Sequence, residues 1–179
     1  MIRIADEHRF EALDAYEVEI VARAVASAER LRLVRVARVV TRLGNGWLYP
    51  LLTVVIAIAL ESSREFVLAA MISLALAFIA YPKMKRSLRR NRPCDYDPSL
   101  VSEVQPLDHY SCPSGHAMTA AAYGVPLIFT CPSAAPFVIV LCALIGWSRV
   151  AMGHHYVSDV LIGTVIGATI ASGVGALLC

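Results

Sequence analysis

The chain has 179 residues, of which 58% are hydrophobic and only 17% are charged, and its mean hydropathy is +0.62. Soluble domains are roughly 45–50% apolar and about 25% charged, so this composition indicates a protein embedded in a membrane. It excludes a disordered chain, and five cysteines are too few for a small disulfide scaffold. A net charge of +2 gives no reason to expect a nucleic-acid partner.

Charged side chains gather at the beginning of the chain. Residues 1–42 contain 15 of the 30 Asp, Glu, Lys and Arg residues, with acids first and arginines later. Apolar residues recur at helical spacing from Leu13 to Leu43, which predicts an amphipathic helix. Its first half fits a solvated arm, and its arginine-rich second half fits either a helix at the membrane surface or an ordinary surface helix. The first 20 residues lack the apolar core of a signal peptide, so we expect no cleavage.

Residues 43–179 form the expected membrane-embedded unit. Five apolar stretches predict an all-α membrane protein with a bundle of about five transmembrane helices: 43–60, 66–81, 117–131, 134–147 and 160–179. Several are shorter than the roughly 20 residues that a bilayer crossing requires, so neighbouring helices or flanking residues must shield their ends. The last stretch carries small residues at four-residue spacing, which allows another helix to approach closely: Gly163, Gly167, Ala171 and Gly175.

One long polar connection, residues 83–115, interrupts the apolar stretches and is the expected active-site loop. With five crossings, it faces the same side of the membrane as the N-terminal segment and the connection 148–159. Seven side chains of these segments then meet at one boundary: Lys85, Arg92, Ser114, His116, Arg149, His155 and Asp159. Cations with two histidines and a carboxylate point to phosphoryl chemistry. The other basic residues of the loop are expected to contact lipid head groups: Lys83, Arg86, Arg89 and Arg90.

Two of the motifs have a clear physical logic. Ser114 precedes an apolar helix, where it is a predicted N-cap, and the free N–H groups of that helix start form an anion site. His155 and Asp159 are four residues apart at the start of the last helix and share a face. Asp159 can therefore hold one imidazole nitrogen while the other attacks phosphorus.

The remaining polar side chains complete this chemistry. Arg149, Lys85 and Arg92 would neutralise phosphoryl oxygens, and His116 is left for proton transfer to the leaving oxygen. Taken singly, a histidine at a helix start is more often a cap or a surface residue, and a basic loop is more often a topology signal. The coincidence of all these groups favours an active site.

These residues resemble the signatures of the phosphatidic acid phosphatase type 2 superfamily. Three signatures stand in order and intact: Lys85-x6-Arg92-Pro93, Pro113-Ser114-Gly115-His116, and Ser148-Arg149-x5-His155-x3-Asp159. One signature alone would be weak, but three in order are specific. The resemblance covers residues 85–159, whereas residues 1–42 match nothing specific in the family.

The resemblance implies a role for each matching residue. His155 would be the nucleophile that forms a phosphohistidine, His116 the general acid, and Asp159 the partner of His155. The phosphate would be bound by five further residues: Lys85, Arg92, Ser114, Gly115 and Arg149. No metal and no other cofactor is implied, and the sequence has no acidic cluster of the magnesium-binding type. His154 and His109 are expected to be bystanders.

The resemblance also suggests the partners: membrane lipids, and as substrate a lipid phosphate whose chain stays in the bilayer. A prenyl phosphate or diphosphate is favoured, because the short chain and residues 110–116 are similar to small enzymes that act on such lipids. Phosphatidate, phosphatidylglycerophosphate and lipid A phosphates remain alternatives. The positive-inside rule predicts an active site that faces the cytoplasm, in a bacterial inner membrane.

Two other functions stay open at this point. A lipid phosphotransferase would form the same phosphohistidine and pass the phosphoryl group to an acceptor lipid. A lipid-binding protein would keep the bundle without catalysis. Soluble haloperoxidases, which share this phosphate pocket, are excluded by the hydrophobic body. The sequence does not indicate an oligomeric state.

Overall fold

The computed structural model describes residues 10–46, 48–59, 63–100, 106 and 108–178. Every regular element in this part of the chain is helical, which confirms the predicted all-α class. The α-helices are α1 (Glu11–Arg30), α2 (Val34–Leu43), α3 (Leu48–Ala59), α4 (Ser63–Leu88), α5 (Pro93–Tyr96), α6 (Gly115–Thr130), α7 (Ala135–Ala151) and α8 (Val157–Leu178). Two short 3-10 turns cover Pro98–Leu100 and Pro132–Ala134.

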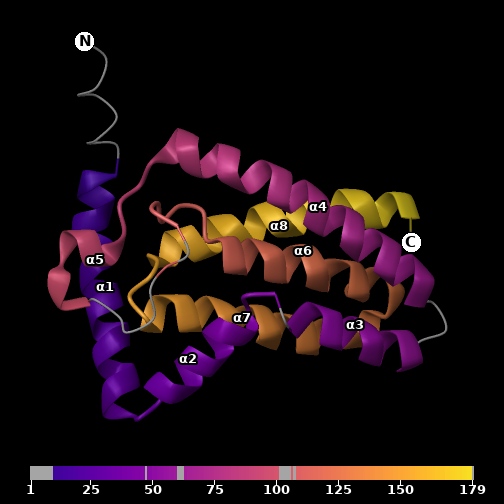
Figure 1. Cartoon of the computed structure of the whole chain (residues 1–179), viewed down its shortest axis with the longest axis horizontal. Coiled ribbons are helices and arrows are strands. Elements are labelled where there is room, and N and C mark those ends of the chain that lie inside the picture. Colours follow the sequence, from indigo (N-terminus) through magenta and orange to yellow (C-terminus); the bar gives the residue numbers. More distant parts are fainter. Residues whose placement is uncertain (1–9, 47, 60–62, 101–105, 107, 179) are drawn as a thin grey trace.

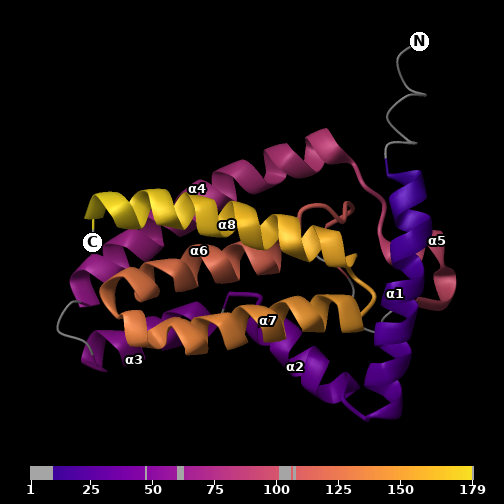
Figure 2. The same ribbon diagram turned by 180° about the vertical axis from the view of Figure 1, so that it is seen from behind.

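Helix α6 runs through the middle of the bundle. Helices α4 and α8 lie on one side of it, and α3 and α7 lie on the other (Figure 1). Helix α1 crosses one end of the bundle, with α2 and α5 beside it, and the C-terminus lies at the opposite end (Figure 2). The end that α1 crosses also holds the turn between α7 and α8 and the start of α6, so the polar segments of the chain meet there.

The number of membrane crossings stays a prediction. Among the described residues, three segments are long and apolar enough to span a bilayer: Arg64–Tyr96, Pro132–Ala151 and Val157–Leu178. Helices α2 and α3, bent by 70° relative to each other, would be a fourth span if taken together. Helix α6 has only 16 residues, fewer than the roughly 20 that a lone spanning helix needs. Most of its side chains are buried among its neighbours, so it resembles a core helix.

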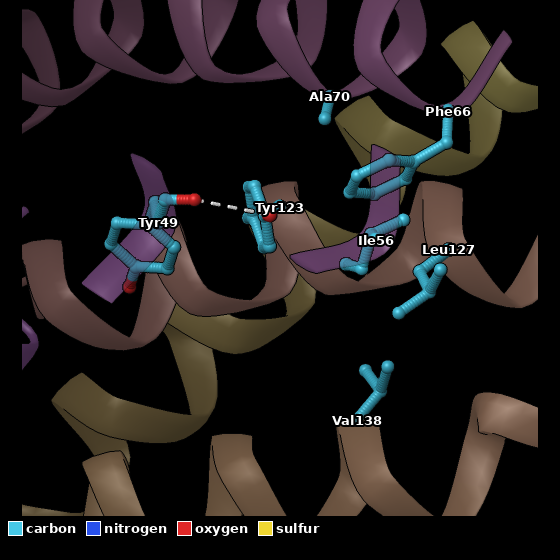
Figure 3. Close-up of a cluster of buried hydrophobic side chains, with 7 residues drawn as sticks. All are labelled: Tyr49, Ile56, Phe66, Ala70, Tyr123, Leu127 and Val138. Carbon is cyan, nitrogen blue, oxygen red and sulfur yellow. Dashed lines mark hydrogen bonds between the residues drawn. The ribbon is translucent and has the colours of Figure 1, made fainter. Parts of the chain in front are cut away.

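A cluster of buried side chains joins four helices of the bundle (Figure 3). It comprises Tyr49 and Ile56 of α3, Phe66 and Ala70 of α4, Tyr123 and Leu127 of α6, and Val138 of α7. The Tyr123 hydroxyl donates a hydrogen bond of 3.2 Å to the Tyr49 carbonyl, and its ring meets Phe66 edge-on at 5.4 Å. The polar end of Tyr123 is thus satisfied inside an apolar cluster.

The small residues of α8 pack against α6, as their spacing predicted. A Cβ atom added to Gly167 would lie 2.2 Å from the Met118 carbonyl oxygen, and one on Gly163 would lie 2.5 Å from the Ser114 carbonyl oxygen. The Ser114 N–H in turn donates to the Asp159 carbonyl at 3.0 Å. The packing of these two helices therefore fixes how far the second signature lies from the third.

The N-terminal segment departs from expectation. The single helix predicted from Leu13 to Leu43 is two helices, which meet at a turn where Arg32 has a φ of 57°. The first of them, α1, is not a solvated arm: it buries Asp14, Glu17 and Val21. Val21 packs in one cluster with residues of α7 and α8. The prediction of a solvated arm was wrong. Acids on a helix face are normally exposed to solvent, whereas Asp14 and Glu17 form ion pairs with the buried Arg90.

Helix α4 is longer than its apolar stretch. The sequence predicted a helix that ends at Tyr81 and a loop from Lys83, but the helix continues through Pro82 to Leu88. Pro82 lies on an exposed part of the helix surface, and proline is tolerated in helices of membrane proteins. This extension places Lys85 on a helix.

Candidate active site

The residues of the three signatures come from five helix ends. Lys85 is in the last turn of α4, Arg92 precedes α5, Ser114 and His116 begin α6, Arg149 ends α7, and His155 and Asp159 lie at the start of α8. Each of these seven side chains belongs to a residue that is at most 9% exposed. The burial of so many polar groups at one end of a helical bundle indicates a functional site.

Two hydrogen bonds link the signatures to one another. Arg92 Nη1 donates to the His154 carbonyl at 2.6 Å, which joins the first signature to the third. The Ser114 N–H donates to the Asp159 carbonyl at 3.0 Å, which joins the second to the third. His154, expected to be a bystander, is 2% exposed and contributes this backbone contact, whereas His109 is exposed.

Asp159 lies next to the candidate nucleophile. Its Oδ2 atom is 3.6 Å from Nδ1 of His155, which is within ion-pair range of a positively charged ring but longer than a hydrogen bond. The same oxygen accepts the Tyr156 N–H at 2.9 Å. Nδ1 of His155 is buried and has no hydrogen-bond partner among the described residues. Catalytic hydrogen bonds of this kind often tighten only when substrate binds.

The surroundings of His155 favour its neutral form. Burial lowers the pKa of His155 well below its usual value of 6.5, and the positive charges of Arg149, Arg92 and Lys85 lower it further. A neutral imidazole has a free nitrogen lone pair, which is the form that a nucleophile needs.

An acid that the sequence analysis did not single out lies among the cations. Asp108 Oδ1 is 2.5 Å from Lys85 Nζ and 2.7 Å from Arg92 Nη2. The Tyr81 hydroxyl donates to the other carboxylate oxygen, Oδ2. Burial opposes ionisation of Asp108, but the hydrogen bonds from Lys85 and Tyr81 outweigh it and lower the pKa of this carboxyl. The carboxylate thus contacts two of the donors that the sequence assigned to phosphate.

Two polar atoms of the predicted phosphate-binding set are buried without a hydrogen-bond partner among the described residues: Ser114 Oγ and Arg149 Nε. Ser114 occupies the N-cap position of α6, but its side chain makes no capping hydrogen bond, contrary to the expected role. An unsatisfied buried polar group costs about 1–3 kcal/mol, so these two groups would gain from a hydrogen-bond acceptor beside them. Both groups are free to donate to an anion.

Gly115 brings the start of α6 against α4. A Cβ atom at this position would lie 2.7 Å from the ring of Tyr81. Any larger residue would therefore have to displace the Tyr81 ring, whose hydroxyl donates to Asp108.

The ring of His116 is held by the turn between α2 and α3. His116 Nε2 lies 2.5 Å from Asn45 Oδ1, between residues 71 positions apart. A Cβ atom on the preceding Gly44 would be 2.9 Å from Cδ2 of the same ring. The α2–α3 turn therefore forms one wall of the site.

A cavity of about 510 Å³ opens beside His116. Its walls come from α3, α4, α6 and the turn before α3, and most of its lining is apolar, with Leu74, Phe78 and Met118 among the residues. Asp108 and His116 also border it. The apolar cavity therefore borders the polar site at His116 and Asp108.

The electrostatic character of the site suits an anion. Within the described part of the chain, no group of three His, Cys, Asp or Glu side chains is placed to hold a metal ion.

One further expectation is wrong. Arg90 is not a head-group contact, because it is only 1% exposed and forms ion pairs with Asp14, Glu17 and Asp159.

Known proteins with similar sequences are membrane-lipid phosphatases. The decaprenylphosphoryl-5-phosphoribose phosphatase of Mycobacterium tuberculosis (strain ATCC 25618 / H37Rv) is 33% identical over 154 residues, which cover 82% of this chain and 81% of that protein. The undecaprenyl-diphosphatase of Sulfolobus acidocaldarius is 30% identical over 113 residues, which cover 62% of this chain and 54% of that protein.

A solved structure shares the fold. The transmembrane PAP2-type phosphatidylglycerolphosphate phosphatase from Bacillus subtilis superposes with a TM-score of 0.74 at 23% identity, over 95% of this chain and 88% of that one. The family model of the PAP2 superfamily matches residues 66–177, which include all three signatures. The chain therefore belongs to the PAP2 superfamily, which is the phosphatidic acid phosphatase type 2 superfamily that the three signatures resemble.

Proposed function

We propose that this integral membrane protein is a metal-independent phosphatase that hydrolyses the phosphomonoester or diphosphate head group of a lipid and releases phosphate through a phosphohistidine at His155. The observation that carries the proposal is the convergence of three signatures at one buried, cation-rich end of the bundle, beside an apolar cavity. The phosphatase activities of the similar proteins support the reaction class.

The first step transfers the phosphoryl group to the enzyme. The neutral imidazole of His155 attacks phosphorus through Nε2, the nitrogen away from Asp159, and the bond between phosphorus and the lipid oxygen breaks. Burial and the charge of Arg149 lower the pKa of His116 to about 3, so its ring takes up a proton only as the negatively charged phosphate binds beside it. His116 then donates this proton to the departing oxygen. The carboxylate of Asp159 stabilises the positive charge that the ring of His155 acquires.

The second step releases phosphate. Water attacks the phosphohistidine, the bond between phosphorus and nitrogen breaks, and His116 takes up the proton of the attacking water. His155 returns to its neutral form and inorganic phosphate leaves. A phosphotransferase would replace water with an acceptor lipid at this step.

The charges of the phosphoryl group need the cations of the site. Arg149 has a buried Nε without a partner among the described residues, and Ser114 contributes a free hydroxyl. Lys85 and Arg92 form ion pairs with Asp108. A bound phosphate would take over these donors, so Asp108 is expected to shift away when substrate enters.

The apolar cavity supports a lipid substrate. It borders His116 and is lined by side chains of α3, α4 and α6, so a hydrocarbon chain can occupy it while the head group reaches His155. Both similar proteins carry names of prenyl-linked substrates, one a phosphorylated ribose on decaprenyl phosphate and the other undecaprenyl diphosphate. A prenyl lipid is therefore the favoured class.

The test is release of inorganic phosphate by the detergent-purified protein in EDTA. The lipid panel contains decaprenylphosphoryl-5-phosphoribose, undecaprenyl diphosphate, phosphatidate and phosphatidylglycerophosphate, with no acceptor lipid. His155→Ala is compared with His109→Ala, which removes an exposed histidine outside the site. We expect release that persists in EDTA, is greatest for a prenyl lipid, and is lost only in His155→Ala.

Other results would redirect the proposal. Release that EDTA abolishes would contradict metal independence. Release only after an acceptor is added would identify a phosphotransferase, and a complete absence of turnover would favour a lipid-binding protein.

A further inference from the structure

Arg90 is the most completely buried cation of the described chain, with a side chain that is 0% exposed. It lies two residues before Arg92, in the stretch between α4 and α5. Its environment is not that of a phosphate ligand. Three carboxylates from two distant parts of the chain surround it: Asp14 and Glu17 of α1, and Asp159 of α8.

Every nitrogen of the Arg90 guanidinium has a defined acceptor. Nε donates to Asp14 at 2.8 Å, Nη2 donates to Glu17 at 2.7 Å, and Nη1 donates to Asp159 Oδ1 at 2.7 Å. The flat group also lies over the ring of Tyr156, with its central carbon 4.0 Å from the ring centroid. Because the planar guanidinium of Arg90 is bound on every side, it cannot rotate, and it fixes the position of the Asp159 carboxylate.

Arg90 binds one oxygen of Asp159 and leaves the other facing His155. Oδ1 is occupied by Arg90, whereas Oδ2 is the oxygen that lies 3.6 Å from Nδ1 of His155. The positive charge of Arg90 also favours the ionised form of a carboxylate that is 0% exposed. Arg90 thus sets the orientation with which Asp159 meets His155.

Helix α1 also contacts the start of α8 directly, through Glu17. Glu17 accepts the backbone N–H of Ser158 at 2.9 Å and the Ser158 hydroxyl at 2.5 Å. Its carboxylate therefore lies at the N-terminus of α8, where a negative charge is stabilised by the helix dipole. One acid of α1 holds the start of α8 directly and also holds Arg90.

We propose that Arg90 is a positioning residue for Asp159, and that α1, through Asp14 and Glu17, is a working part of the active site. The proposal rests on the proposed function, because it takes His155 and Asp159 as the reacting pair. It assigns a role to an N-terminal segment that the family signatures do not include.

The kinetic test compares Arg90→Lys with Arg86→Gln. Lysine keeps the charge but cannot hold several acceptors in one plane, so Asp159 is misplaced. We expect kcat to fall on the order of 100-fold in Arg90→Lys, with KM within about twofold of wild type, because the phosphate-binding residues are untouched. Arg86→Gln removes an exposed charge of α4 and should leave both constants unchanged.

Glu17→Gln provides a second variant that keeps the shape of the side chain. It weakens both contacts of Glu17, so kcat should fall by less than in Arg90→Lys, again with KM preserved. If Glu17 acts through Arg90, the double variant should be no slower than Arg90→Lys alone. Additive losses in kcat would show that Glu17 acts on α8 only through Ser158, and would overturn its action through Arg90. Circular dichroism and size-exclusion elution check that each variant is folded.

A measurement without substrate separates this proposal from the proposed function. In protein labelled with ¹⁵N-histidine, the signals of His155 are those that disappear in His155→Ala. They should shift in Arg90→Lys and Glu17→Gln and stay in place in Arg86→Gln. Unchanged His155 signals in Arg90→Lys, or a kcat equal to that of Arg86→Gln, would overturn the positioning role. Shifted signals in a protein that hydrolyses no lipid would instead keep the positioning role and refute the phosphatase.

Discussion

The two histidines of the site are held by different partners. Burial and the cations around His155 keep its imidazole neutral, whereas the ring of His116 is fixed by Asn45 from the α2–α3 turn. A neutral nucleophile and an oriented proton donor are the two requirements of phosphoryl transfer to histidine. Each arrangement leads to a separate prediction.

Asn45→Ala should impair proton transfer by His116, because the ring loses the partner that orients it. We expect kcat to fall on the order of 10-fold for a prenyl phosphate, whose alkoxide leaving group needs a proton. With p-nitrophenyl phosphate, whose leaving group is already stable as an anion, the loss should be much smaller. An equal loss with both substrates, measured as phosphate release, would contradict this role of Asn45.

The lowered pKa of His155 predicts how the charge of its ring depends on pH. Because its pKa is lowered, the ring stays neutral as the pH falls through 6.5, and protonation sets in only at more acidic pH. Among the charged groups that face it, Arg149 of α7, Arg92 and Lys85 lower this pKa. ¹⁵N chemical shifts of His155, followed during a pH titration, should therefore remain those of a neutral imidazole at pH 6.5. Half-protonation near that pH would contradict the account.

At the scale of helices, the contact between α6 and α8 positions the chemistry. Gly163 and Gly167 let the backbone of α8 touch that of α6, and the start of each helix carries part of the site. Any change that widens this contact should move Ser114 away from Asp159.

Gly167→Ala tests this contact against a matched control in the same helix. A Cβ atom at Gly167 would lie 2.2 Å from a backbone oxygen, whereas one at Gly173 would meet nothing within 4 Å. Overpacking of this kind costs about 1–3 kcal/mol, so Gly167→Ala should lower the thermal unfolding temperature in detergent. Gly173→Ala should keep or raise it, because alanine is the better helix former. A Gly167→Ala protein as stable as Gly173→Ala would refute the tight contact.

At the scale of the whole molecule, α1 and α2 lie at the end of the bundle that carries the site (Figures 1 and 2). The arginines of α2 and the connection before it are therefore near the same membrane face as the active site. The positive-inside rule favours the cytoplasm for a face that carries such arginines. We propose this orientation in a bacterial inner membrane.

A cysteine introduced at Ser99, an exposed residue of the site end, reports the orientation. In intact cells it should resist a thiol reagent that cannot cross the inner membrane and react after the cells are opened. The wild-type protein, with its own cysteines, provides the background. Labelling of Ser99→Cys in intact cells, above this background, would place the site on the periplasmic face.

The sequence predicts the parts of this site that depend on short spacing. The apolar stretches locate the helices, and the distances within each signature place His155 beside Asp159. Contacts across long separations are beyond such reasoning: Arg90 meets Asp14 over 76 residues, and His116 meets Asn45 over 71. Residue type does not predict these contacts, because nothing in the sequence distinguishes a buried acid such as Asp14 from a solvent-exposed one.

The covalent intermediate is the most direct test of the central claim. Protein incubated briefly with a ³²P-labelled prenyl phosphate in EDTA, then quenched in alkali, should carry label that survives base and is released by acid, as expected for a phosphohistidine. Peptide mapping should place the label on His155, and His155→Ala should carry none. Turnover of the lipid without such label, or label that persists in His155→Ala, would contradict the account.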